Sequence, residues 1–460
     1  RVSIQLPARW MLVARDAFNG VILWKKPMKK WHSHLWPLKS GPTQLARRLV
    51  AMKDRVYITL GVDEPVSVLD AATGELIHEL PDSKGAEEII VEGGQVFVLE
   101  SPEEWELNSF LPFHNTGDQA RIRRDFAWNK KKRDVKAYDS VTGKRIWGHN
   151  NKVAPLTMTA DEHRVFFHDG EKVVALNRSS GDVAWSAGKS FLPETVRFNF
   201  GPKLVIHDGV VLYAGGNRTM KAIDAKTGKQ LWEAPHARGG YQSPEDLLVM
   251  RGMVWSAPTT SGRDSGVFTG RDLRTGKVMV EIPPNVDTYW FHHRCYIAKA
   301  TDNFLMPSRT GIEFIDPDTK NWDINHWVRG GCLYGVMPAN GLTYAPPHNC
   351  ACYPEAKLFG FNALASAAPS RALGKVIEAN RLERGPAFGQ ATDAAGNGES
   401  DWPTYRHDNL RSGFSNNRVG DKLAEKWATK LEGKLSAVTL AENKLFVARV
   451  DAHEVVALHT

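Results

Sequence analysis

Long apolar runs are missing from this chain of 460 residues: no stretch of 18 or more consecutive apolar residues occurs. The sequence therefore predicts no membrane-spanning helix. Cysteine is scarce, with four residues that all lie between positions 295 and 352, and neither a Cys-Cys pair nor a Cys-x-x-Cys-His haem-attachment sequence is present. The chain begins with Arg1 and has no signal-peptide pattern, so we expect it to be part of a longer polypeptide.

Acidic residues are outnumbered by basic ones. There are 59 Lys and Arg against 52 Asp and Glu, which gives a formal net charge of +7. An excess of positive charge attracts anionic ligands, although an ordinary basic surface explains it as well. A protein or an anionic glycan is the partner that we consider for this chain.

One pattern recurs along the chain and predicts the fold. An apolar strand ends in Asp or Asn, Gly follows four residues later, and a second strand has Trp at the eighth position in several copies. Six clear copies are LVARDAFNGVILW, VSVLDAATGELIH, VKAYDSVTGKRIW, VVALNRSSGDVAW, MKAIDAKTGKQLW and FTGRDLRTGKVMV, and weaker copies surround Asp316 and Asn362. The spacing of roughly 40 to 50 residues is that of one four-stranded blade, and 15 Trp with 39 Gly suit an all-β chain. The sequence predicts an all-β fold, a seven- or eight-bladed β-propeller.

The residue types of this pattern have a physical reason. Asp-x-x-Thr-Gly forms a hairpin connection in which the Asp side chain caps turn amides and Gly adopts a left-handed conformation. A Trp at the end of the following strand is expected to wedge between neighbouring blades and bury a large apolar area.

The copies VKAYDSVTGKRIW and MKAIDAKTGKQLW resemble the repeat of PQQ-dependent alcohol dehydrogenases and their non-catalytic relatives. This resemblance covers most of residues 10–365 and implies a quinoprotein-type propeller. The dehydrogenases of this family stack the quinone on a disulfide between adjacent cysteines, whereas here Ala351 separates Cys350 from Cys352. PQQ is therefore not expected as the cofactor, and a PQQ-dependent oxidoreductase is the less favoured enzyme.

Two further segments set the expected domain organisation. The run from Asp401 to Gly413 resembles the opening of another PQQ-like propeller, and the Cys-containing runs between 327 and 357 resemble large two-propeller proteins of planctomycete-type bacteria. We expect residues 1–365 to form the propeller, 366–400 a linker, and 401–460 the first strands of a further blade. These last strands either begin a second propeller or close the first ring.

The cysteines and several histidines gather in one short stretch, which allows three interpretations. Two disulfides suit an extracytoplasmic protein, with three pairings open. A metal ion held by thiolates and imidazoles is the second interpretation, although the Cys-x-x-Cys spacing of common zinc sites is missing. The residues considered as metal ligands are His292, His293, Cys295, Cys332, His348, Cys350 and Cys352, with His326 as a further candidate.

The third interpretation is a catalytic pocket at one mouth of the propeller channel. A lyase that acts on uronic-acid polysaccharides needs a cation for the substrate carboxylate, a base and an acid, which Arg, His and Tyr supply. The candidates are His292, His293, Arg294, Tyr344 and His348. Structural hydrogen bonds and packing explain the same residues. We therefore predict an extracytoplasmic binding or scaffold propeller, and keep an enzyme, lyase-like or metal-dependent, as the alternative.

Overall fold

The computed structural model divides the chain into two compact units, Arg1–Ser366 and Ala367–Thr460. The residues that it describes are 9–29, 45–101, 131–193, 202–236, 247–256, 260–261, 264–285, 296–307, 311–325, 327–331, 335–347, 358, 360–366 and 401–460. The linker predicted over residues 366–400 lies almost wholly outside them. That linker, and the assignment of 401–460 to a further propeller, stay predictions.

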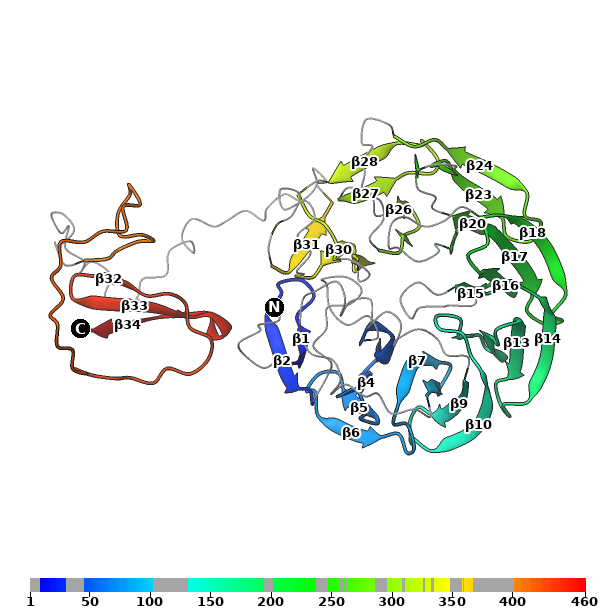
Figure 1. The fold of residues 1–460 in the computed structure, drawn as a ribbon, viewed down its shortest axis with the longest axis horizontal. Coiled ribbons are helices and arrows are strands. Elements are labelled where there is room, and N and C mark those ends of the chain that lie inside the picture. The colour runs from blue at the N-terminus through cyan, green and yellow to red at the C-terminus, as the bar shows by residue number, and fades with distance from the viewer. Residues whose placement is uncertain are drawn as a thin grey trace, which may run out of the picture. The chain divides into compact units, whose positions relative to one another are not determined.

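The first unit is a ring of antiparallel sheets (Figure 1). Six sheets have four strands that are hydrogen-bonded in chain order, and in one of them the separate hairpin β21–β22 intervenes between β20 and β23. They are β3 (Leu49–Met52), β4 (Arg55–Thr59), β5 (Val66–Asp70) and β6 (Leu76–Glu79); β7 (Ala86–Glu92), β8 (Gln95–Glu100), β9 (Lys132–Asp139) and β10 (Arg145–Lys152); β11 (Thr159–Ala160), β12 (Arg164–His168), β13 (Lys172–Asn177) and β14 (Val183–Lys189); β15 (Lys203–His207), β16 (Val210–Ala214), β17 (Thr219–Asp224) and β18 (Gln230–Pro235); β19 (Leu248–Met250), β20 (Met253–Ser256), β23 (Phe268–Asp272) and β24 (Val278–Ile282); and β25 (Lys299–Ala300), β26 (Leu305–Met306), β27 (Ile312–Ile315) and β28 (Trp322–Asn325).

Two smaller sheets lie side by side in the same ring. They are β1 (Met11–Arg15) with β2 (Ile22–Pro27), and β29 (Met337–Ala339) with β30 (Leu342–Ala345) and β31 (Asn362–Ala365). A 3-10 helix η1 (Leu45–Arg48) precedes β3, and β21 (Thr260–Ser261) and β22 (Asp264–Ser265) form a short hairpin. The predicted β-propeller with four-stranded blades is confirmed. Its count of seven or eight blades stays a prediction, because these two sheets are incomplete among the described strands.

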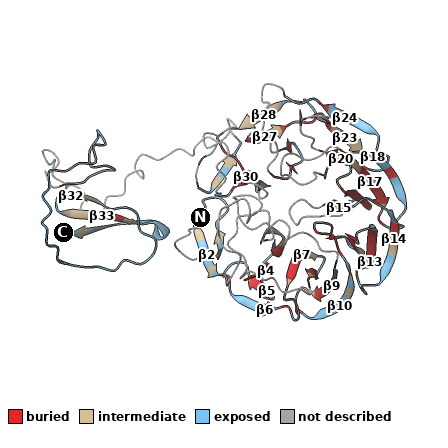
Figure 2. Cartoon of the chain, in the orientation of Figure 1, coloured by how far each residue is buried: buried red, intermediate tan, exposed pale blue. Residues whose placement is uncertain are grey.

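The apolar core lies between neighbouring blades. One cluster joins Phe97 and Trp147 of the β7–β10 sheet to Phe167 and Val174 of the next sheet, and equivalent clusters fill other boundaries. Middle strands are buried on both faces, which explains unbroken apolar runs such as Val173–Leu176. The fourth strand of a blade is called the outer strand below, and β2 corresponds to it because it follows the same turn motif. Outer strands such as β10 and β14 have mostly exposed residues (Figure 2).

The connection between third and outer strand has one structure in most blades. At Asp139, the Oδ1 atom accepts hydrogen bonds from the N–H of Val141 at 3.1 Å, the N–H of Thr142 at 2.7 Å and the Thr142 hydroxyl at 2.8 Å. Gly143 follows with φ of 70°. The same capping recurs at Asp70, Asp224, Asp272 and Asp316. The turn thus favours Asp, Thr and Gly at fixed positions, and in the Asp316 turn Lys320 takes the glycine position with φ of 60°.

The Trp of an outer strand reaches the turn of the next blade. Trp147 Nε1 donates to the carbonyl oxygen of Arg178 at 2.7 Å, and a Cβ placed on Gly181 would lie 2.6 Å from Trp147 Cε3. Trp24, Trp185 and Trp232 repeat both contacts, on Gly74, Gly228 and Gly276. Glycine is therefore required twice, for its positive φ and for the indole that covers it. This contact between blades is called the Trp–Gly interlock below.

The second unit contains one sheet in its described part. Its strands are β32 (Thr439–Ala441), β33 (Lys444–Arg449) and β34 (Glu454–His459), with a 3-10 turn η6 (Val450–Ala452) between the last two. Trp402 makes an isolated bridge to Leu440, next to this sheet. Of the large apolar residues described in this unit, Val447 alone is buried.

Glycine substitution separates the two requirements of the interlock. Gly20 and Gly181 occupy the same turn position with φ of 76° and 77°, but a Cβ on Gly20 would have no neighbour within 4 Å. We expect Gly20→Ala to cost about 1 kcal/mol for the left-handed backbone. Gly181→Ala is expected to cost about 2 kcal/mol or more, because the indole must also move. Urea unfolding measures both, and equal losses would contradict the interlock.

Candidate functional site

The structure places one of the predicted site residues. Tyr344 lies on β30, where its backbone pairs with Ala363 of β31. Its side chain is buried, its hydroxyl accepts a hydrogen bond from Asn340 Nδ2 at 3.3 Å, and its ring centroid lies 6.3 Å from that of Phe361. In the described residues these contacts hold Tyr344 within the β29–β31 sheet.

The other predicted site residues lie outside the described part of the chain. They are His292, His293, Arg294, Cys295, His326, Cys332, His348, Cys350 and Cys352. The disulfide, metal and lyase interpretations therefore stay predictions. Within the described ranges, no group of three or more His, Cys, Asp or Glu side chains is arranged to hold a metal ion.

What the structure does bring together is a set of turns. The residue after the motif Asp donates its N–H to the turn between the first and second strands of the same blade. These bonds join Ala71 to Asp54, Ser140 to Gly94, Arg178 to His163, Ala225 to Gly209 and Leu273 to Gly252, at 2.8 to 3.2 Å. Both turns of each blade therefore lie on one side of the ring, which is called the turn face below.

The second residue after the motif Asp or Asn varies from blade to blade, while the backbone of the turn keeps a positive φ at its fifth residue. These tip residues are all exposed: Phe18, Ala72, Val141, Ser179, Lys226, Arg274 and Asp318. Two are large and apolar, with Phe18 exposed to 74% and Val141 to 64%. A fixed frame that presents variable side chains is typical of binding loops on a rigid scaffold.

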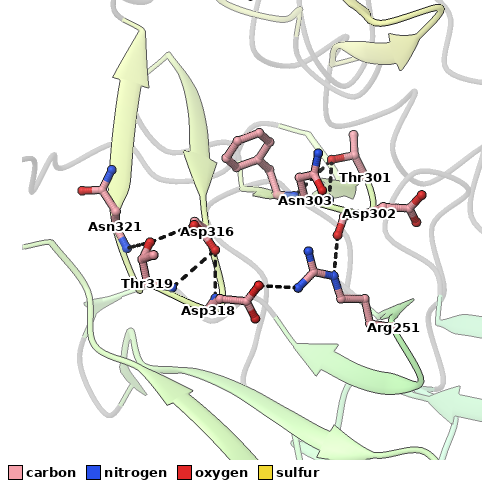
Figure 3. A network of polar contacts seen from close by, with 9 residues as sticks. Arg251, Thr301, Asp302, Asn303, Asp316, Asp318, Thr319 and Asn321 are labelled. Atoms are coloured by element: carbon pink, nitrogen blue, oxygen red, sulfur yellow. Dashed lines mark hydrogen bonds and ion pairs between the residues drawn. The ribbon is translucent and has the colours of Figure 1, made fainter.

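Charged tips also connect neighbouring blades. Arg251, in the turn before β20, donates from Nη1 to Asp318 Oδ2 at 2.8 Å and from Nε to the carbonyl oxygen of Asp302 at 2.5 Å (Figure 3). Arg274 likewise meets Asp208 Oδ2 at 3.0 Å. Because these pairs are exposed, each adds little stability. Their effect is to fix the positions of the tips.

The motif carboxylates are held in the charged form. Hydrogen bonds from the Thr142 N–H and hydroxyl lower the pKa of Asp139 below its ordinary value of 3.8, and the pKa values of Asp70, Asp224, Asp272 and Asp316 shift in the same direction. Donors that bind the charged form favour it. These five carboxylates are thus ionised at neutral pH.

One blade boundary departs from the interlock. His78 stands where four outer strands have Trp, and a Cβ on Gly143 would lie 2.5 Å from its ring. The carbonyl of Ser140, which an indole would otherwise bond, instead accepts from Arg55 Nη1 at 2.5 Å. His78 Nε2 is buried and has no hydrogen-bond partner among the described residues. At this boundary His78 thus covers the glycine and Arg55 bonds the turn carbonyl, whereas one Trp makes both contacts at the other boundaries.

We expect this boundary to weaken with acid. Burial lowers the pKa of His78 below 6.5, Arg55 lowers it further, and Asp139 raises it in part. The unfolded chain therefore takes up the proton first, so stability is lost as the pH falls below about 6.5.

Urea unfolding at about pH 7 and about pH 5 measures this loss, which His78→Trp should reduce. The converse change Trp147→His should add a pH-dependent loss of stability at the boundary between the β7–β10 and β11–β14 sheets. If neither variant alters the pH dependence, His78 is not its source.

Comparison with known proteins agrees with this architecture. Residues 131–286 match the family described as outer membrane protein assembly factor BamB. BamB of Burkholderia pseudomallei (strain K96243) is 27% identical over 159 residues, which are 32% of this chain and 39% of that protein. The matched segment thus spans about two-fifths of the curated relative. The turns at Asp139, Asn177, Asp224 and Asp272 all lie inside the family match.

Solved structures with similar folds are distant. The crystal structure of BamB from Moraxella catarrhalis has a TM-score of 0.45 at 13% identity and covers 73% of this chain and 92% of that one. Quinohemoprotein alcohol dehydrogenase from Comamonas testosteroni has a TM-score of 0.43 at 12% identity, over 73% of this chain and 67% of that one. The fold assignment rests on the sheets described above.

The chain is a β-propeller of PQQ-like repeats. This recognition is confirmed by the family match and by the blades, whereas the likeness to planctomycete-type proteins stays a prediction. In the part of the chain that the structure describes, no helix is long and apolar enough to cross a membrane.

Sequence reasoning missed the tip residues. It followed the constant positions of the repeat and the cluster of Cys and His. The signal was an apolar residue, Phe18 or Val141, at the second position of a turn whose other residues are polar or small.

Proposed function

We propose that this chain is an extracytoplasmic protein-binding scaffold, and that its turn face is the surface that binds. The observation that carries the proposal is the set of variable, exposed tips on turns that all begin with Asp or Asn and have a positive φ at the fifth residue. Apolar and aromatic side chains that are exposed before binding commonly supply the anchors of a protein interface. Phe18 and Val141 are the tips that fit this role.

The relatives support a protein as the partner. The matched family and the Burkholderia protein are both described as outer membrane assembly factors, so we propose a protein of outer-membrane assembly as the partner class. An anionic glycan, suggested by the net charge of +7, is the alternative. Apart from Tyr344, the residues of the lyase-like or metal-dependent alternative lie outside the described part of the chain.

Site-specific photocrosslinking in the bacterial envelope tests the surface. A benzophenone amino acid at position 18 or 141 should give discrete protein adducts. The same probe at Ile77 or Met279, which are exposed on outer strands, is the matched control and should not. Equal adduct patterns from all four positions would contradict binding through the turn face.

Binding of the captured partner provides the second measurement. We expect Phe18→Ser with Val141→Ser to weaken it about tenfold or more, the loss typical of interface anchors, with an unchanged melting temperature. Binding of polygalacturonate that survives both substitutions, without any protein adduct, would favour the glycan alternative.

A further inference from the structure

Each turn of the turn face offers a second variable position beside its tip. This is the residue that follows the positive-φ position, called the exit residue below, and it is exposed in all seven turns that the structure describes. The exit residues are Val21, Glu75, Lys144, Asp182, Lys229, Lys277 and Asn321. Every one of these turns therefore presents a pair of side chains, its tip and its exit residue, to solvent.

The charge of these pairs differs between blades. Two of the seven described turns carry a cation at both positions, Lys226 with Lys229 and Arg274 with Lys277. They precede β18 and β24, the outer strands of sheets that follow each other along the chain. The other five pairs contain one cation between them, Lys144. The residues Lys226, Lys229, Arg274 and Lys277 are called the basic arc below.

Hydrogen bonds join the two turns of the basic arc. Arg274 Nη2 donates to the carbonyl oxygen of Asp208 at 2.7 Å and to its Oδ2 atom at 3.0 Å. The next residue, Gly209, accepts a hydrogen bond at 2.9 Å from the N–H of Ala225, which directly precedes Lys226. Both turns therefore meet at one hairpin, on the same side of the ring.

The backbone that carries the basic arc is fixed. The N–H of Lys226 donates to Asp224 Oδ1 at 3.1 Å, and its carbonyl oxygen accepts a hydrogen bond from Arg164 Nη2 at 3.1 Å. The N–H of Arg274 donates to Asp272 Oδ1 at 3.1 Å. The basic side chains thus project from a backbone that is already ordered, which lowers the entropic cost of binding a ligand.

The acidic groups next to the basic arc are already engaged. Asp208 pairs with Arg274, and the motif carboxylate of each turn accepts hydrogen bonds from its own Thr. The ammonium groups of Lys226, Lys229 and Lys277 form no ion pair with any residue in the described ranges. Like charges on adjacent turns repel, so these lysines cost stability without an ion pair there in return. Such a surface is suited to an anionic ligand.

We propose that the basic arc binds an acidic segment of the protein that the turn face recognises. The proposal rests on the proposed function and adds the chemistry of the partner, which combines an apolar anchor for Phe18 and Val141 with a run of Asp or Glu. Ammonium and guanidinium groups form strong hydrogen bonds with carboxylates. A protein segment is favoured over a uronic-acid glycan, because the same face carries exposed apolar tips that a glycan does not match.

Fluorescence anisotropy of the full chain with a labelled octaglutamate peptide tests the basic arc. We expect saturable binding at about 20 mM salt that weakens as salt is added, because exposed charges are screened. The same peptide made of glutamine should not bind. The variant Lys226→Gln, Lys229→Gln, Lys277→Gln should bind octaglutamate about tenfold more weakly, since three surface charge contacts contribute roughly two- to threefold each.

A matched variant removes the same charge elsewhere. Lys84, Lys152 and Lys189 are exposed, and Lys152 and Lys189 end outer strands that begin at the turn face, so they lie on the other side of the ring. Changing these three to Gln should leave octaglutamate binding unchanged. Absence of saturable binding, or equal losses in both triple variants, would overturn the proposal. Tighter binding of octagalacturonate through the same lysines of the basic arc would overturn it in favour of a glycan.

The variant Phe18→Ser with Val141→Ser separates this proposal from the proposed function. It should leave octaglutamate binding unchanged, because both tips lie in other turns. Protein adducts at positions 18 and 141 without octaglutamate binding would overturn the acidic segment alone. Octaglutamate binding without adducts at either position would contradict the proposed function instead.

Discussion

The structure of the ring depends on one contact, the indole of an outer strand that covers the turn glycine of the next blade. No blade can bury its own apolar faces, because the core lies between blades. The Trp–Gly interlock joins neighbouring blades at their outer strands. It adds a directional bond from Nε1 to a turn carbonyl at 2.7 to 3.0 Å, so it fixes the position of each turn as well as the distance between sheets.

The binding surface depends on the turns of the same repeat. A turn that is capped from within by its Asp side chain presents its second residue after the Asp, the tip, to solvent. Ion pairs such as Arg251 with Asp318 then join tips across boundaries. Two blades depart from the Trp–Gly interlock. His78 together with Arg55 replaces the Trp of one outer strand. In the other, Val280 stands at the Trp position, and the next turn along the chain has Lys320 at the glycine position after Asp316. The scaffold tolerates both without losing its sheets.

The sequence predicted the blades because each turn demands particular residue types. Asp, Thr, Gly and Trp recur at fixed spacing, since a cap, a left-handed φ and a large apolar wedge each admit few side chains. The tips were not predicted, because a position that varies freely has no pattern. The basic arc was also missed, since only the fold brings the turns of two blades together. Of the predicted site, Tyr344 lies in the β29–β31 sheet, and the His, Arg and Cys candidates stay predictions.

A double-mutant cycle on Trp232 and Gly276 tests the interlock most directly. A Cβ on Gly276 would lie 2.7 Å from Trp232 Cδ2, so Gly276→Ala should cost more beside Trp232 than beside Ala at that position. We predict a coupling of about 1 kcal/mol or more in the free energy of unfolding. Costs that add to within about 0.5 kcal/mol would show that indole and turn act independently, and would contradict this account of the ring.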